Sequence, residues 1–120
     1  MCSAQCGITL IELLVVMVVI GILASLAMPA YQQYAREGRR SDALQRLSEM
    51  VALQEQFRLN NKTYTANIGA GGLNRPVTTE DGSYTFSLVV SSDACPLVSC
   101  FVFEATPIGA QTADMCGIMG

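Results

Sequence analysis

The chain has 120 residues, a formal net charge of −3 and no histidine, and only 14% of its residues are charged. Soluble domains usually carry about 25% charged residues, and here the shortfall is concentrated in one place. Residues 8–27 contain a single charge, Glu12, whereas all seven Lys and Arg residues lie between Arg36 and Arg75. This composition excludes an ordinary soluble domain, a strongly basic nucleic-acid-binding domain and catalysis by histidine.

The apolar run over residues 8–27 is long enough to cross a membrane as a helix, and no second run approaches its length. At about 1.5 Å per residue it spans roughly 30 Å, the thickness of the hydrocarbon core of a bilayer. A secretory signal has an apolar stretch of about 7–15 residues, so this run is too long for one. A plain membrane anchor stays open.

Glu12 is the feature that argues against a plain anchor. A carboxylate in an apolar span costs about 2.5–3.5 kcal/mol at the middle of the bilayer and less near its edge. An ionisable residue in such a span therefore marks a functional site. The alternative is that Glu12 lies at the membrane interface, where its side chain extends into the headgroups.

Residues 28–60 are predicted to continue as an amphipathic helix. Its apolar stripe recurs at alternating steps of four and three residues: Ala43, Leu47, Met50, Gln54 and Phe57. This spacing follows the 3.6-residue period of a helix, and most charged residues lie off the stripe. We expect the stripe to pack against the protein's own sheet.

Beyond the helix, the pattern changes to that of strands. Apolar and polar side chains alternate in residues 84–90, which is typical of a half-buried strand. Residues 100–105 form a second, more apolar run, and residues 116–119 are expected to begin a third strand. Because the connections are too short for parallel crossovers, we expect antiparallel pairing. The predicted fold class is α+β, with a long N-terminal helix packed on a small antiparallel sheet within residues 61–120.

The start of the chain carries a family motif. Residues 6–16 read CGITLIELLVV, and the pattern continues through Gly21, Pro29 and Tyr31. This segment resembles the prepilin cleavage and methylation motif of type IV pilins and type II secretion pseudopilins. The resemblance implies the type IV pilin fold, with residues 8–27 as its transmembrane and assembly helix.

The same resemblance implies roles for single residues. A prepilin peptidase would cut between Gly7 and Ile8, which removes residues 1–7 as a leader peptide. Ile8 would then become the N-terminus and be N-methylated, and Glu12 would be the carboxylate needed for efficient assembly. In a bundle of such helices, the Ile8 amine of one subunit can pair with the Glu12 carboxylate of a neighbour, so that neither charge is buried alone.

Gly21 and Pro29 are the predicted helix break. Pro29 removes one backbone hydrogen bond and disfavours helical backbone at the residue before it. One interpretation is a simple kink. The other, which the resemblance to pilins implies, is that the segment between these residues extends when subunits pack in a filament.

The leader departs from the family pattern because it contains no Lys or Arg. Counted alone, the arginines that follow the apolar run would place the C-terminus in the cytoplasm by the positive-inside rule. The resemblance implies the opposite: a single-pass inner-membrane protein with a periplasmic ectodomain, which later moves to the pilus and cell surface. A start codon upstream of Met1 stays open.

A second resemblance lies near the C-terminus. Residues 104–117 read EATPIGAQTADMCG, which is similar to a segment of PilE-like minor pilins that DNA-uptake pilins of the ComP kind share. In this sequence one residue separates Asp114 from Cys116, where the family pattern has two. Those relatives commonly continue through another strand, so a truncation at Gly120 stays open.

The cysteines fall into two sets: Cys2 and Cys6 in the leader, and Cys95, Cys100 and Cys116 in the last quarter. The leader pair is expected to have no structural role, and the second set suits an exported, oxidising location. Three exported cysteines allow three single disulfides, and we favour the short Cys95–Cys100 loop, where Pro96 helps the turn. No metal site is expected, because the spacing and a fourth ligand are absent.

The sequence therefore predicts a type IV pilus subunit, a minor pilin, that assembles through its N-terminal helix into or at the tip of a filament for adhesion, twitching motility or DNA uptake. Its expected partners are other pilin subunits, the prepilin peptidase, the inner membrane and the pilus assembly platform. The alternatives are a type II secretion pseudopilin and a pilus-displayed DNA-uptake receptor.

DNA is not expected as a partner, because residues 60–120 contain only Lys62 and Arg75 against five acidic residues. No enzyme activity and no cofactor are expected. The glycine-rich stretch at residues 69–72 lacks the lysine of a phosphate-binding loop, and without histidine there is no ordinary catalytic triad.

Overall fold

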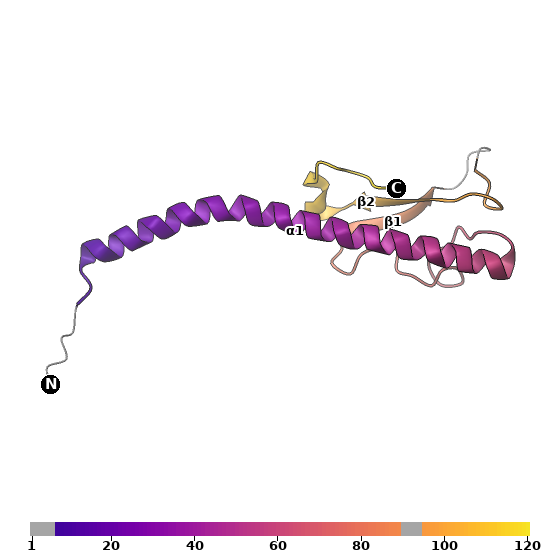
Figure 1. Cartoon of the computed structure of the whole chain (residues 1–120), viewed down its shortest axis with the longest axis horizontal. Coiled ribbons are helices and arrows are strands. Elements are labelled where there is room, and N and C mark those ends of the chain that lie inside the picture. The colour runs from indigo at the N-terminus through magenta and orange to yellow at the C-terminus, as the bar shows by residue number, and fades with distance from the viewer. Residues whose placement is uncertain (1–6, 90–94) are drawn as a thin grey trace, which may run out of the picture. The chain divides into compact units, whose positions relative to one another are not determined.

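The computed structural model describes residues 7–89 and 95–120 (Figure 1). Its elements in chain order are helix α1 (Leu10–Asn61), strand β1 (Tyr84–Val89), strand β2 (Val102–Pro107) and the short 3-10 helix η1 (Gly109–Ala113). The chain divides into two compact units, Met1–Ala35 and Arg36–Gly120. Cys2, Cys6 and the end of the predicted first strand at Val90 lie outside the described residues.

Helix α1 is one helix of 52 residues that contains both the apolar and the amphipathic segment, as the sequence predicted. At its start, the Thr9 hydroxyl accepts a hydrogen bond from the Glu12 N–H at 3.3 Å, which is the bond of an N-cap residue. At its end, Lys62 has a φ of 60° and donates its backbone N–H to the Arg58 carbonyl at 2.7 Å. A residue in this left-handed conformation is a common way to end a helix.

The predicted stripe on the second half of α1 is the face that the fold buries. Ala43, Leu47, Met50 and Gln54 are buried, and Phe57 is partly buried against the same core. Gln54 is polar, and its amide group pairs with the Thr65 backbone: Nε2 donates to the carbonyl at 2.6 Å, and Oε1 accepts from the N–H at 3.0 Å. The stripe prediction is confirmed.

The two strands form an antiparallel sheet in which Tyr84 is opposite Pro107 and Val89 is opposite Val102. The buried side chains of β1 alternate with more exposed ones, as predicted for residues 84–90. Strand β2 begins two residues later than the predicted start because Cys100 belongs to a turn, in which its N–H donates to the Pro96 carbonyl at 2.9 Å.

The predicted third strand at residues 116–119 is reduced to a single bridge. Met119 and Ala105 exchange backbone hydrogen bonds of 2.7 and 3.1 Å. The preceding residues turn instead of extending, since Gly117 has a φ of 57° and donates to the Asp114 carbonyl. The sheet itself therefore has two strands within the described ranges.

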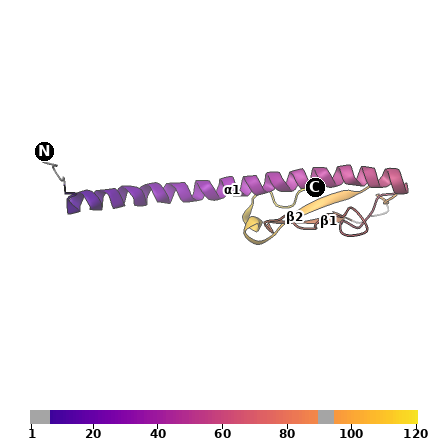
Figure 2. The ribbon, with the colours of Figure 1, turned by 90° about the horizontal axis from the view of Figure 1, so that it is seen from below.

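The core of the second unit lies between the buried stripe of α1 and one face of the sheet (Figure 2). The loop over residues 62–83 adds Ile68 and Leu73 to this core. Gly72 allows the loop to fold back, because a Cβ there would lie 1.8 Å from the Asn67 carbonyl oxygen. Core and loop together fix the surfaces described next.

Candidate functional site

The first unit presents an apolar helix surface. Every described residue up to Met28 is exposed, and the large apolar side chains range from 48% exposure at Val19 to 83% at Leu10. An 18-residue window of this helix has a mean hydropathy of 2.8, so the helix is long and apolar enough to cross a membrane. Such a surface is costly in water and is stable only in lipid or against other apolar surfaces.

Gly7 and Ile8, the predicted cleavage site, lie just before Thr9, which precedes the helix, and Glu12 lies in the first turn of the helix. Thr9 and Glu12 have the Thr-x-x-Glu spacing of a helix capping box. The sequence analysis did not use this spacing, although it predicts the start of the helix. A carboxylate in the first turn is favoured by the helix dipole. Among the described residues, no hydrogen bond or ion pair reaches the Glu12 side chain.

Gly21 and Pro29 both lie inside α1, and the helix is continuous through them in the single chain. Because Pro29 has no N–H, the carbonyl of Ser25 lacks its usual helical partner. The Ser25 hydroxyl donates to the Ile22 carbonyl at 2.7 Å one turn earlier. A side chain at Gly21 would meet no atom within 4 Å. The helix is therefore not interrupted at Gly21 or Pro29 in the single chain, and both the kink and the extension of this segment in a filament stay predictions.

The predicted disulfide between Cys95 and Cys100 is confirmed, with Cα atoms 5.0 Å apart. Cys116 is free and exposed, and its Sγ accepts a hydrogen bond from Arg40 Nη1 at 2.6 Å. Within the described ranges, no three His, Cys, Asp or Glu residues come together as a metal site would require. The disulfide closes a turn that contains Leu97. The Leu97 carbonyl accepts hydrogen bonds from the Thr63 hydroxyl and the Tyr64 N–H, which connects this turn to the segment after α1.

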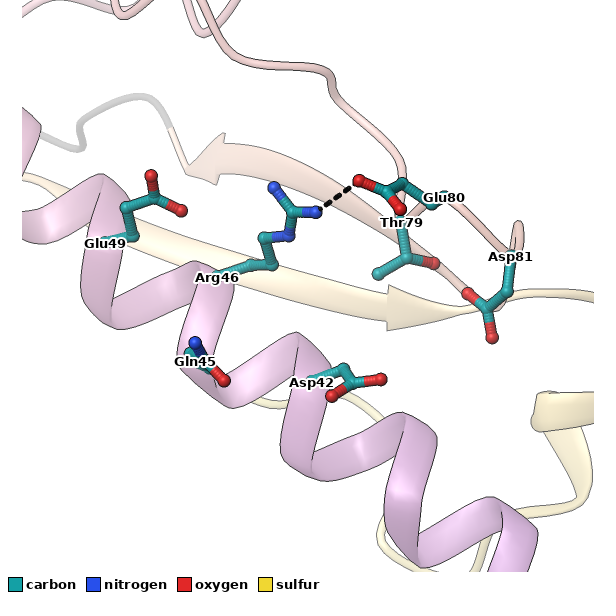
Figure 3. Close-up of a pocket in the computed structure, with 7 residues that line it drawn as sticks. All are labelled: Asp42, Gln45, Arg46, Glu49, Thr79, Glu80 and Asp81. Carbon is teal, nitrogen blue, oxygen red and sulfur yellow. Dashed lines mark hydrogen bonds and ion pairs between the residues drawn. The ribbon is translucent and has the colours of Figure 1, made fainter.

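A groove of about 520 Å³ lies between α1 and the turn that precedes β1 (Figure 3). Its lining comes from one face of the helix and from that turn: Asp42, Gln45, Arg46, Glu49, Thr79, Glu80 and Asp81. Arg46 Nη2 lies 2.8 Å from Glu80 Oε1 across the groove. Hydrogen bonding to the Ser83 hydroxyl holds the pKa of Asp81 below its usual value. The sequence analysis did not single out this groove.

A buried polar network fastens the C-terminal segment to the helix. Gln111, which is 1% exposed, donates from Nε2 to the Arg36 carbonyl at 3.1 Å, to the Tyr84 hydroxyl at 3.1 Å and to Asp114 Oδ2 at 3.2 Å. The Cys116 N–H, followed by the Tyr84 hydroxyl, lowers the pKa of the Asp114 carboxyl, and burial raises the pKa of Tyr84. The network accounts for the glutamine and aspartate of the C-terminal family segment.

Comparison with known proteins assigns both halves of the chain. Residues 2–28 match the profile of the prokaryotic N-terminal methylation motif. Residues 29–120 match the profile described as "Type IV minor pilin ComP, DNA uptake sequence receptor". The chain belongs to the type IV pilin family. The long helix and the small antiparallel sheet agree with the pilin fold that the N-terminal motif implied.

The relatives of this pilin are fimbrial proteins. Fimbrial protein EcpC of Eikenella corrodens is 35% identical over 90 residues, which cover 75% of this chain and 57% of EcpC. A type IV major pilin PilE1 of Neisseria gonorrhoeae is 32% identical over 90 residues, covering 75% of this chain and 54% of PilE1. A fimbrial protein of Moraxella nonliquefaciens is 54% identical over 41 residues, or 34% of this chain and 27% of its own. This pilin therefore spans about half the length of the first two relatives, and no solved structure matches it significantly.

Proposed function

We propose that this pilin is a structural subunit, a minor pilin, that assembles through α1 into or at the tip of a type IV pilus. The observation that carries the proposal is the exposed apolar half of α1, whose single charge, Glu12, lies within the methylation motif matched over residues 2–28. Lipid can cover this surface before assembly, and the helices of other subunits can cover it afterwards. Adhesion, twitching motility and DNA uptake are the processes that such a filament would serve.

Processing at the start of α1 would create the assembly contact. A prepilin peptidase cuts between Gly7 and Ile8, and the new Ile8 amine is methylated. In the filament this amine pairs with the Glu12 carboxylate of a neighbouring subunit, which has no partner within the described part of its own chain. Loss of one partner from a buried pair costs about 3–5 kcal/mol, enough to decide whether a subunit is retained.

The proposed location follows the same order of events. Before assembly, the subunit is a single-pass inner-membrane protein with Arg36–Gly120 in the periplasm. The assembly platform then transfers it into the pilus. The disulfide between Cys95 and Cys100 supports an oxidising compartment for this unit.

N-terminal mass spectrometry of the chain isolated from its membrane tests the processing step. The expected product begins at N-methylated Ile8. A Gly7→Leu variant is the matched control, and it should keep the leader because the residue before the cut is changed. A mature protein that begins before Ile8 would contradict the proposal.

A type II secretion pseudopilin is the first alternative, because pseudopilins share the N-terminal motif. The match over residues 29–120 and the fimbrial relatives favour the pilus. A deletion strain separates the two functions, since loss of pili supports the proposal and loss of secreted exoproteins with normal pili supports the alternative.

A pilus-displayed DNA receptor is the second candidate, and the description of the matched profile favours it. The charges of the second unit argue against it: Arg39, Arg46 and Arg75 each pair with an acidic residue, which leaves few cations for phosphates. A gel-shift assay with the full chain in detergent decides between the structural subunit and the DNA receptor. Binding that weakens steeply with salt would support the receptor, and no shift at micromolar chain would exclude it.

A further inference from the structure

The groove between α1 and the turn before β1 holds one unpaired negative charge. Three of its four acidic side chains pair with arginines: Glu80 with Arg46, Asp81 with Arg39, and Glu49 with Arg75. Asp42 is exposed on the groove wall, and no ion pair joins it to another described residue. The groove can therefore accept one additional cation without displacing an existing pair.

Lys62 is the complementary charge on the same unit. It is exposed at the end of α1, and within residues 7–89 and 95–120 no hydrogen bond or ion pair holds its ammonium group. Its φ of 60° lies in the left-handed region, where glycine is the usual residue at a helix end. A long cationic side chain therefore lies at a position where the backbone conformation favours glycine.

The other cations of this unit are less suited to the groove. Arg58 donates to the Tyr64 hydroxyl at 2.8 Å and lies 4.9 Å from the centre of its ring. Arg36 is half-buried, and its carbonyl accepts the Gln111 side chain. Arg40 donates to Cys116 Sγ. Lys62 is therefore the exposed cation whose charged group makes no contact among the described residues.

We propose that Lys62 of one copy of this pilin enters the groove of a second copy and pairs with Asp42; this inference rests on the proposed assembly into a filament. Lys62 directly follows the end of α1, and Asp42 lies 20 positions earlier on that helix, so in parallel copies the contact displaces one copy from the other by about 30 Å along the helix axis. It joins different surfaces of the two copies and is therefore heterologous. A heterologous contact of this kind can be repeated along a filament, so it forms wherever copies of this pilin are neighbours in the pilus.

A charge swap in the full chain, expressed in a piliated host, tests the contact. The readout is the amount of chain in sheared filaments relative to the membrane pool. Lys62→Glu and Asp42→Lys should each lower this ratio about fivefold, the upper range for one exposed ion pair. The double variant should restore it, because each copy then carries the reversed pair.

Two controls separate the contact from folding and from net charge. Lys62→Gly removes the ammonium group but suits the left-handed backbone, so it should lower incorporation without destabilising the fold. Glu104→Lys changes the net charge as Asp42→Lys does, but it lies on β2, so incorporation should not change. A cysteine pair at positions 42 and 62, in a Cys116→Ser background, should give linked oligomers in the filaments when treated with a bismaleimide about as long as the ion pair that it replaces, because the two backbones are too far apart for a direct disulfide.

Each outcome decides the question. Suppose that the unsubstituted chain is found in filaments. If neither single variant then lowers incorporation, or if the double variant does not restore it, the contact is overturned and the proposed function stands. Filaments in which the cysteine pair gives no linked oligomers would overturn it as well, since the copies would then be dispersed among other subunits. Absence of the unsubstituted chain from filaments would overturn both the contact and the proposed function.

Discussion

Replacement of Gln54 by leucine should loosen the attachment of the 62–83 loop to α1. Gln54 is fully buried, and its amide forms hydrogen bonds of 2.6 and 3.0 Å with the backbone carbonyl and N–H of Thr65. Leucine has a similar size but no polar atoms. The variant therefore removes both bonds and leaves both Thr65 groups without their partner.

The expected loss of unfolding free energy follows from those two groups. A buried donor or acceptor that loses its partner costs about 1–3 kcal/mol. Thr65 is only half-buried, so water can reach part of its backbone. The combined cost of the two unpaired groups should therefore fall near the lower end of this range. We expect Gln54→Leu to destabilise the second unit by about 2–4 kcal/mol.

Urea unfolding of the full chain in mild detergent, followed by circular dichroism, measures this loss. Gln56→Leu is the matched control, because Gln56 is an exposed glutamine two positions further along the same helix. The control should change stability by no more than about 0.5 kcal/mol. If Gln54→Leu were as stable as the control, the two hydrogen bonds would not hold the loop.

Three further predictions concern assembly, pH and the disulfide. Glu12→Ala should reach the membrane at normal levels but be depleted from sheared filaments, as judged by immunoblotting, and normal incorporation would refute its role. The pKa of the Asp114 carboxyl is lowered in the folded chain, so its stabilising contribution is complete above the unfolded value of about 3.9 and is lost as pH falls through the lower folded value. Unfolding midpoints measured from about pH 5 to about pH 2 should show this loss, and an Asp114→Asn variant should show less of it. Replacing Cys95 and Cys100 by alanine should lower the unfolding free energy by less than about 3 kcal/mol, because the closed loop is short, and an unchanged urea midpoint would contradict this.

The local features of this pilin were predictable from sequence because each depends on neighbouring residues. The stripe from Ala43 to Gln54 follows the helical period, and the alternation in β1 follows the pleat of a strand. The disulfide between Cys95 and Cys100 closes a turn of five residues' separation. The strand expected at residues 116–119 is reduced to one bridge, because the turn at Gly117 leaves Met119 alone to pair with Ala105 of β2.

The apolar run with one carboxylate indicated a membrane-spanning helix with a functional residue, and the resemblance of residues 6–16 to the prepilin motif then implied the pilin family and the candidate assembly residues without any tertiary information. Tertiary structure alone decided which distant side chains meet. Gln111 reaches the Arg36 carbonyl across 75 positions, and Arg40 reaches Cys116 across 76. Asp42 remains unpaired in its groove because the turn before β1 supplies acids to the neighbouring arginines. Periodicity reports which face of an element is buried, but it contains no information about which surface covers that face.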